Sequence, residues 1–371
     1  MISADLYTIS ENEALSNDGM NILQEIHRPI VFEDTGAKTK AIHLFELMDI
    51  VDAHQDNRFN SYMEELCGFS DEELEIFLSA VNQLVSFQQY LFQIDKVIVP
   101  FDALISHFSL FLKISGFRQF ERVLEVGPGC GYLSLFMNDD PRNKFYCQVE
   151  TTQIFYLLQS YLGSFLYGED FFEGAHPGHL LTKALSSKEG ESGVTFDLSK
   201  RVSYMEHVPW WGTGNVTKEK FDIITMNAIL CELSKDALGL YLDMAYKALK
   251  DDGFFVVQCM GAAHPSTGPK MQKSTGSEML DTVVEKGFHI HFFVYDCSHE
   301  NGRHTVENMV FLKKGHFLLT SDTQQQSEVP IHQEQNELFS AYYRQNDQVQ
   351  RRKYSKQELI GLLKERYSHI A

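Results

Sequence analysis

The chain lacks several features that would assign it to a special class of protein. Its 371 residues include six cysteines but no C-x-x-C pair, and no apolar run reaches about 18 residues. The scattered cysteines argue against a disulfide framework or a cysteine zinc site and indicate buried thiols in a reducing compartment. The sequence offers no membrane span, and its start shows no basic stretch followed by an apolar one, so we expect a soluble cytoplasmic protein.

Basic residues are also scarce. Lysine and arginine number 32 against 51 aspartates and glutamates, which gives a net charge of −19. Such a field repels a phosphate backbone from most of the surface, so we do not expect nucleic acid as a partner. The 43% hydrophobic and 12% aromatic content is that of a packed globular protein with a sizeable core.

The periodicity of the apolar residues divides the chain into three regions. Residues 1–116 are predicted to be mostly helical, with a capping box formed by Ser70 and Glu73. Residues 117–318 alternate short β-rich runs with helices, which indicates βαβ units and a parallel sheet. They include an irregular stretch at about 163–201, interpreted as a lid or substrate wall. Residues 319–371 are predicted to form a polar linker and a C-terminal helix capped by Ser355 and Glu358.

Two details refine this division. The late runs HIHFFVY and NMVFLK flank Asn301-Gly302, a turn signal that predicts an antiparallel pair at the end of the sheet. The apolar helices of the N-terminal region could pack on the core as a substrate cap or on a second copy of the chain. A homodimer is therefore one of two open possibilities.

The most informative motif is the run from Glu125 to Gly131, EVGPGCG, placed where a buried strand ends and a helix begins. In a doubly wound sheet this position is the ligand crevice, and glycines there let the backbone approach a ligand closely. A dinucleotide fingerprint requires a small residue at its sixth position, where this chain has Tyr132. The motif therefore favours S-adenosylmethionine over a dinucleotide.

Acidic residues flank this motif at positions suited to that cofactor. Glu125 is placed for the methionine amino group of S-adenosylmethionine. Glu150, about 20 residues after the glycines at the end of the second strand, fits an acceptor for the two ribose hydroxyls. Turn, strand context and acidic residue together predict a cofactor site.

These residues resemble a known family. RVLEVGPGCGYLSLF, the strand ending at Glu150 and FDIITMNAIL look like the first, second and fourth motifs of class I S-adenosylmethionine-dependent methyltransferases. More narrowly, residues 120–315 resemble the sugar O-methyltransferases of bacterial polysaccharide and natural-product clusters, a match that depends on the step Cys231-Glu232-Leu233. The resemblance implies an α/β, Rossmann-like class I methyltransferase sheet with an N-terminal helical region and a C-terminal helical tail.

The resemblance also implies which residues contact the cofactor. Glu206 and His207 follow the third strand and are expected near the adenine, although an ordinary loop histidine is the alternative for His207. Asn227 ends the fourth strand, where the family holds the methionine portion and the methyl side, although it could simply be a turn residue. The complete set of expected cofactor contacts is Glu125, Gly127, Pro128, Gly129, Gly131, Tyr132, Glu150, Thr151, Glu206, His207 and Asn227.

Candidates for the chemistry come from the loops after the later strands. Methyl transfer needs an aligned acceptor and, for a hydroxyl, removal of its proton. Glu232 and His264 are placed for that role, although a solvated carboxylate and an ordinary loop histidine are the alternatives. The adjacent Trp210 and Trp211 could form a platform for a sugar ring or simply pack in the core.

A metal site is not expected, because the histidines at 289, 291, 299 and 304 do not combine with a pair of aspartates after the fourth strand. The predicted function is therefore methyl transfer to a small-molecule acceptor, most simply a hydroxyl of a sugar or polyhydroxylated metabolite. Two other hypotheses stay open. One is an N-methyltransferase or protein methyltransferase, since an acidic surface suits a basic peptide, and the other is a catalytically silent methyltransferase fold that binds a partner.

Overall fold

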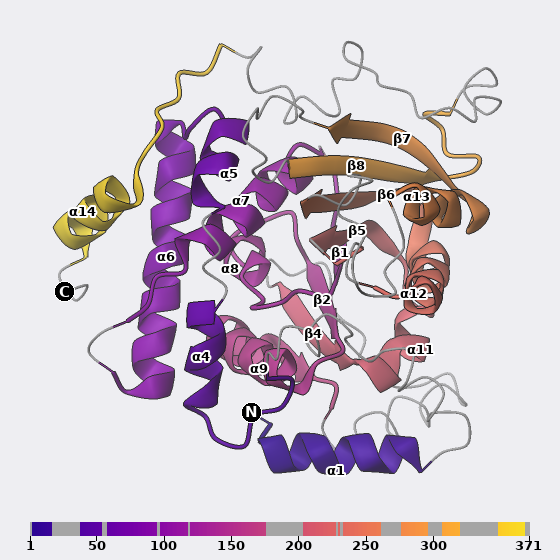
Figure 1. Ribbon diagram of the computed structural model, residues 1–371, viewed down its shortest axis with the longest axis horizontal. Coiled ribbons are helices and arrows are strands. Elements are labelled where there is room, and N and C mark those ends of the chain that lie inside the picture. Colours follow the sequence, from indigo (N-terminus) through magenta and orange to yellow (C-terminus); the bar gives the residue numbers. More distant parts are fainter. Residues whose placement is uncertain are drawn as a thin grey trace.

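A computed structural model describes residues 2–16, 38–53, 58–94, 97–117, 119–175, 203–227, 229–230, 233–260, 276–295, 306–319 and 348–367. At its centre is an eight-stranded sheet with the order β3-β4-β2-β1-β5-β6-β8-β7 (Figure 1). The strands are β1 (Arg122–Val126), β2 (Phe145–Glu150), β3 (Phe171–Glu173), β4 (Tyr204–Pro209), β5 (Phe221–Asn227), β6 (Leu249–Met260), β7 (Phe288–Tyr295) and β8 (Val306–Lys313).

The sheet is parallel except at one end. Strands β3, β4, β2, β1, β5 and β6 run parallel to their neighbours. Strand β8 is antiparallel to both β6 and β7. In the described part of the chain, helices lie between β1 and β2, between β2 and β3, between β4 and β5 and between β5 and β6, as parallel pairing requires. The α/β, Rossmann-like fold class predicted from the sequence is confirmed, and so is the antiparallel pair at the sheet's end.

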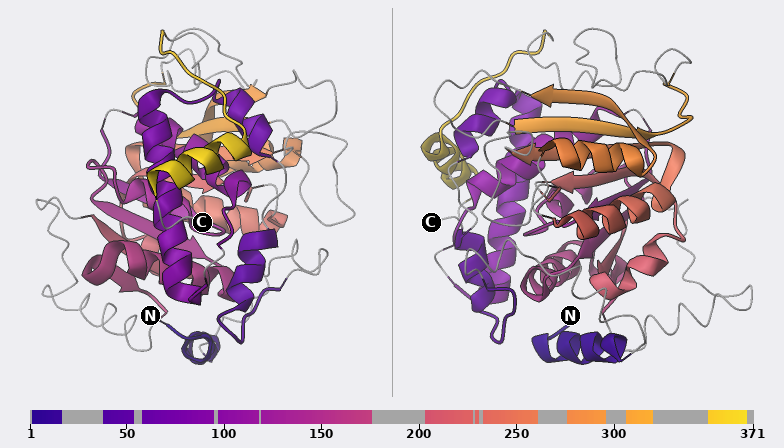
Figure 2. Two further views of the ribbon diagram at one scale, coloured as in Figure 1. Left: turned by 90° about the vertical axis from the view of Figure 1, so that its left-hand side faces the viewer. Right: turned by 45° about the vertical axis from the view of Figure 1, so that its right-hand side comes forward.

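Helices cover both faces of the sheet (Figures 1 and 2). One face packs against α7 (Phe101–Ser115), α8 (Leu133–Met137) and α9 (Gln153–Tyr167), and α6 (Asp71–Phe92) lies outside them. We name it the α9 face. The opposite face packs against α11 (Thr213–Val216), α12 (Lys235–Ala248) and α13 (Gly276–Glu285), and we name it the α12 face. The candidate site described below lies on the α9 face.

The chain before β1 is helical in the parts that the structure describes. It contains α1 (Ala4–Leu15), α4 (Glu46–Ala53), α5 (Phe59–Glu65), α6 and α7. Their apolar side chains share one core cluster with the α9 face of the sheet. The capping box of Ser70 and Glu73 forms at the start of α6 as predicted. How the chain divides into domains stays a prediction.

The C-terminal helix α14 (Lys356–Arg366) begins with the predicted capping box of Ser355 and Glu358 and contacts α6. Before it, Arg352 and Phe69 exchange two backbone hydrogen bonds of 2.9 Å each. Lys356 Nζ pairs with the buried carboxylate of Asp102 at 2.5 Å. The predicted linker at 324–335, the turn Asn301-Gly302 and most of the 163–201 stretch lie outside the described residues, although 171–173 form the edge strand β3.

Candidate functional site

The glycine turn follows β1 at the carboxyl edge of the sheet. Gly127, Gly129 and Gly131 have φ angles of +65°, +56° and +75°, a region that side-chain-bearing residues rarely adopt. A methyl group placed on Gly127 would lie 2.0 Å from Ile229 Cδ1, so the turn packs directly against the residues that follow β5. A methyl group on Gly129 would meet no heavy atom within 4 Å. Gly129 therefore faces open space, as a backbone that receives a ligand must.

Glu125 lies on the α9 face beneath this turn and is fully buried. Its Oε2 accepts hydrogen bonds from the hydroxyl of Tyr146 and from Gln148 Nε2, the latter at 3.0 Å. Its Oε1 has no hydrogen-bond partner among the described residues. Burial raises the pKa of the Glu125 carboxyl to about 7, against the effect of its two donors. A cation beside Oε1 would favour the ionised form.

Glu150 ends β2 and is 4% exposed. The backbone N–H groups of Thr151 and Thr152 both donate to its Oε1 at 2.8 Å. Gln159 Nε2 donates to its Oε2 at 2.9 Å and also to the carbonyl oxygen of Gly129 at 2.5 Å. Gln159 therefore ties the glycine turn to the carboxylate. Since a carboxylate oxygen can accept two hydrogen bonds, Oε2 keeps acceptor capacity.

Two further expected cofactor contacts are Pro128, within the turn, and Tyr132, directly after it. Pro128 is buried, and its carbonyl oxygen accepts the N–H of Gly131 at 2.9 Å. Tyr132 is 1% exposed and its ring meets that of His107 edge to face, with 5.9 Å between centroids. The large side chain of Tyr132, at the position where a dinucleotide fingerprint has a small residue, therefore packs against α7. Whether either residue contacts a cofactor stays a prediction.

The expected placement of Glu206 and His207 after the third strand is wrong. Both lie inside β4, which extends to Pro209, and alternation along the strand points their side chains to opposite faces. Glu206 faces the α12 side and lines a small cavity with Cys147 and Glu219. His207 is fully buried on the α9 face, where its ring stacks on Tyr156 at 3.8 Å.

The contacts and the pKa of His207 also differ from those expected of an exposed histidine in a loop. Its Nδ1 pairs with Ser160 Oγ at 2.9 Å, and burial lowers its pKa well below the usual value. The ring therefore stays neutral.

The two tryptophans pack in the core and do not form an exposed platform. Trp210 and Trp211 are 2% and 7% exposed and lie perpendicular to each other. Trp210 Nε1 donates to Glu11 Oε1 at 3.1 Å, and the ring of Trp211 meets that of Tyr7 at 4.9 Å. Both contacts come from α1, which lies in the region predicted to be mostly helical, but its docking on the tryptophans was not predicted. The packing alternative was correct.

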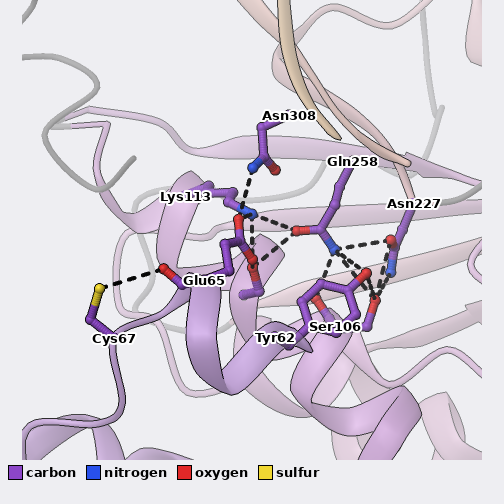
Figure 3. A network of polar contacts seen from close by, with 9 residues as sticks. Tyr62, Glu65, Cys67, Ser106, Lys113, Asn227, Gln258 and Asn308 are labelled. Carbon is purple, nitrogen blue, oxygen red and sulfur yellow. Dashed lines mark hydrogen bonds and ion pairs between the residues drawn. The ribbon is translucent and has the colours of Figure 1, made fainter. Parts of the chain in front are cut away.

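Asn227 is the last residue of β5 and is only partly buried. Its amide belongs to a set of polar side chains between the α9 face, α5 and α7 (Figure 3). We name this set the amide network; its members are Tyr62, Glu65, Ser106, Ser109, Lys113, Asn227, Gln258 and Asn308.

Except for Asn227, sequence reasoning missed the amide network. One signal was present, because Ser106, Ser109 and Lys113 recur at helical spacing along a largely apolar helix. Gln258 and Asn308 sit opposite each other on β6 and β8, and no pattern within either strand marks them. The residues that they contact can be recognised only from the assembled sheet.

The two catalytic candidates, Glu232 and His264, lie outside the described residues, as do Cys231, Asp296, His299 and His304. His289 and His291 lie on β7. The roles suggested for Glu232 and His264 stay predictions.

Comparisons with known proteins give a likeness only at the level of solved structures. No family model matches the chain, and no curated protein matches it. None of the helices in the described ranges combines the length and apolar character needed to cross a bilayer.

The similar solved structures include three of different kinds. The pyocyanin biosynthetic protein PhzM is 17% identical with a TM-score of 0.36; the match covers 57% of this chain and 56% of PhzM. A TehB-like SAM-dependent methyltransferase from Corynebacterium glutamicum is 14% identical with a TM-score of 0.33, over 55% and 86% of the two chains. The N-methyltransferase NodS from Bradyrhizobium japonicum, with S-adenosyl-L-homocysteine, is 13% identical with a TM-score of 0.35, over 63% and 98%. The function of this chain therefore has to be inferred from its own residues.

Proposed function

We propose that the chain is an S-adenosylmethionine-dependent methyltransferase whose acceptor is a small molecule, with a hydroxyl of a sugar or polyhydroxylated metabolite as the methylated group. One observation carries the proposal. The glycine turn at the end of β1 leaves open space at Gly129, and Gln159 ties that turn to the carboxylate of Glu150 at the end of the neighbouring strand. This is the crevice in which doubly wound sheets bind their ligands.

The residues around the turn fit S-adenosylmethionine chemically. The Oε1 of Glu125 is a buried acceptor with no partner among the described residues, which suits the cationic amino group of the methionine portion. Glu150 would accept the ribose hydroxyls through the remaining capacity of Oε2. When bound, the cofactor supplies the methyl group as an electrophile.

The chain's own part in the reaction is alignment and proton removal. A hydroxyl acceptor has to be held in line with the transferred methyl group, and its proton has to pass to a base as the new bond forms. Asn227, at the carboxyl edge beside the turn, is placed to orient the acceptor or the methyl side of the cofactor. Glu232 and His264 are the proposed bases.

A second candidate is methylation of a basic peptide or of an amine. The net charge of −19 favours it, because an acidic surface attracts a basic partner. Analysis of the methylated product separates the two candidates. An O-methyl product excludes the amine and peptide versions.

Isothermal titration of the purified protein with S-adenosylmethionine and S-adenosylhomocysteine, with NADH as the control, tests the proposal. We expect both sulfur-containing ligands to bind in the micromolar range, on the order of −8 kcal/mol, and NADH not to bind. If a folded sample binds neither ligand, the methyltransferase proposal fails and the fold serves as a binding module. If NADH binds instead, the turn is a dinucleotide site.

A further inference from the structure

The buried ammonium of Lys113 fixes the orientation of a neighbouring amide. Lys113 is 4% exposed, and its Nζ donates to Glu65 Oε1 at 2.7 Å, Ser109 Oγ at 2.8 Å and Gln258 Oε1 at 2.6 Å. An ammonium group can only donate hydrogen bonds. The carbonyl oxygen of Gln258 must therefore face Lys113, because the NH2 end of the amide would meet it donor to donor.

The orientation of the Gln258 amide in turn determines the orientation of the Asn227 amide. With its carbonyl turned to Lys113, Gln258 directs its NH2 group to the other side, where Nε2 lies 3.2 Å from Asn227 Oδ1 and 3.1 Å from the carbonyl oxygen of Ser106. The hydroxyls of Tyr62 and Ser106 also lie within 3.3 Å of Nε2. The Asn227 carbonyl is thus engaged inside the amide network (Figure 3). Ser106 Oγ lies between the two ends of the Asn227 amide, 3.4 Å from Oδ1 and 3.1 Å from Nδ2, and accepts one N–H of Nδ2.

The Asn227 amide lies beside the glycine turn. Asn227 is the last residue of β5 and is partly exposed, whereas Gln258 is fully buried. Two residues further on, Ile229 packs against Gly127 so closely that a methyl group there would lie 2.0 Å from its Cδ1. Because its carbonyl is engaged by Gln258 and one N–H by Ser106 Oγ, the group that the amide can still offer at the carboxyl edge is its second N–H, which is a donor.

We propose that Lys113, acting through Gln258, holds Asn227 with its NH2 group toward the methyl side of the site, and that this donor selects oxygen acceptors over amines. The inference rests on the proposed methyltransferase function and names its acceptor class. Lys113 and Gln258 are positioning residues, and Asn227 determines specificity.

The selection follows from counting lone pairs. When a hydroxyl oxygen receives the methyl group, one lone pair forms the C–O bond, the electrons of the broken S–CH3 bond stay on sulfur, and the hydroxyl proton passes to a base or to water. The second lone pair of the oxygen can accept the N–H of Asn227. A neutral amine has one lone pair, which the new C–N bond uses, so it offers only N–H donors. Those donors would face the donor of Asn227 without a partner.

Two ligands of known chemistry test this orientation before the acceptor is identified. S-adenosylhomocysteine has a bare sulfur at the transfer position, and sinefungin is the S-adenosylmethionine analogue with an amine there. The wild-type protein should prefer S-adenosylhomocysteine. Gln258→Met removes the amide that holds the Asn227 carbonyl and adds no charge, so Asn227 can turn its carbonyl outward. We expect the affinity for sinefungin relative to S-adenosylhomocysteine to rise about tenfold.

A matched control and a double-mutant cycle isolate the effect. Gln88, 2% exposed, uses both ends of its amide on the backbone of Ile98, far from the site in sequence; Gln88→Met should change stability but not the affinity ratio. In an Asn227→Ala background, Gln258→Met should shift the ratio no further. Asn227→Ala alone, at a partly exposed position, should also raise the ratio and carries the test if Gln258→Met does not fold.

The outcomes separate the two proposals. If the folded wild-type protein binds neither ligand, the methyltransferase proposal fails and this inference fails with it. If both ligands bind but neither Gln258→Met nor Asn227→Ala changes the ratio, the methyltransferase proposal stands and the orientation inference is overturned. A shift by Gln258→Met that persists without Asn227 would also overturn it.

Discussion

The two faces of the sheet are built from the same strands but have opposite chemistry. Strand alternation places Glu125, Gln148 and His207 in one row across the α9 face, because they are register partners on β1, β2 and β4. The neighbouring row on the α12 face contains Leu124 and Cys147 and ends on β4 with Glu206, its one charged member among these three. The polar residues of the α9 face gather toward the carboxyl ends of the strands, whereas the α12 face is mostly apolar. One face therefore carries the candidate site, and the other is expected to contribute chiefly to stability.

The largest effect should come from the open space at the glycine turn. Gly129→Val would put a branched side chain into that space, so we expect binding of S-adenosylhomocysteine to disappear. The left-handed backbone, with φ of +56°, adds a strain of about 1–2 kcal/mol to folding. Titration and thermal unfolding would check both effects. Unchanged affinity in a folded variant would move the site away from the turn.

A substitution on the α12 face should lower the stability of the protein without weakening ligand binding. Leu242 on α12 is fully buried, so Leu242→Ala should lower the free energy of unfolding by about 2–5 kcal/mol through lost contacts and a cavity. Its affinity for S-adenosylhomocysteine, measured below the unfolding transition, should match the wild type. A large loss of affinity would mean that the α12 face also shapes the site.

Glu125 should make the stability of the α9 face depend on pH. Its pKa is raised in the folded protein from 4.5 to about 7, so the folded state holds the proton more tightly. The associated stability is present below pH 4.5 and is lost as the pH rises through about 7, up to about 3 kcal/mol. Glu125→Gln stays neutral and should become more stable relative to the wild type as the pH rises. Urea unfolding of both proteins at about pH 5 and about pH 8 measures this; parallel changes would contradict it.

The smallest effect should come from Glu150. If it accepts hydrogen bonds from the ribose, Glu150→Ala should weaken the binding of S-adenosylhomocysteine by about 1.5–3 kcal/mol. The N–H groups of Thr151 and Thr152 also lose their acceptor, so Glu150→Gln, which keeps a carbonyl oxygen, is the matched variant. Titration calorimetry gives the difference. A loss well below about 1 kcal/mol would place the ribose elsewhere.

Local patterns predicted much of the fold. The alternation of strands and helices, the two capping boxes and the turn at Gly127 to Gly131 depend on neighbours within a few residues, and each gave the correct element. Helix α1 lies in the region predicted to be mostly helical, but its docking was missed, because the contacts of Tyr7 and Glu11 with Trp211 and Trp210 are contained in no local pattern.

The candidate site was predictable in part. Glu125 and Glu150 were proposed as cofactor contacts from their positions relative to the glycines, and those roles stay predictions. Their partners Tyr146, Gln148 and Gln159 come from cross-strand and helix contacts that the sequence does not show. His207 was misplaced because a histidine after an apolar run reads as the start of a loop. In the folded chain, stacking on Tyr156 compensates for burying it.

The bond between Trp210 and Glu11 also bears on how the chain is made. The two residues are 199 positions apart, so α1 leaves the ribosome long before its docking surface exists. At roughly 5–20 residues per second, that interval lasts on the order of ten seconds or more. During it the apolar side of α1, including Tyr7, has no native surface to cover. Translation therefore imposes on this helix a waiting period in which a chaperone or another nascent chain can compete for it.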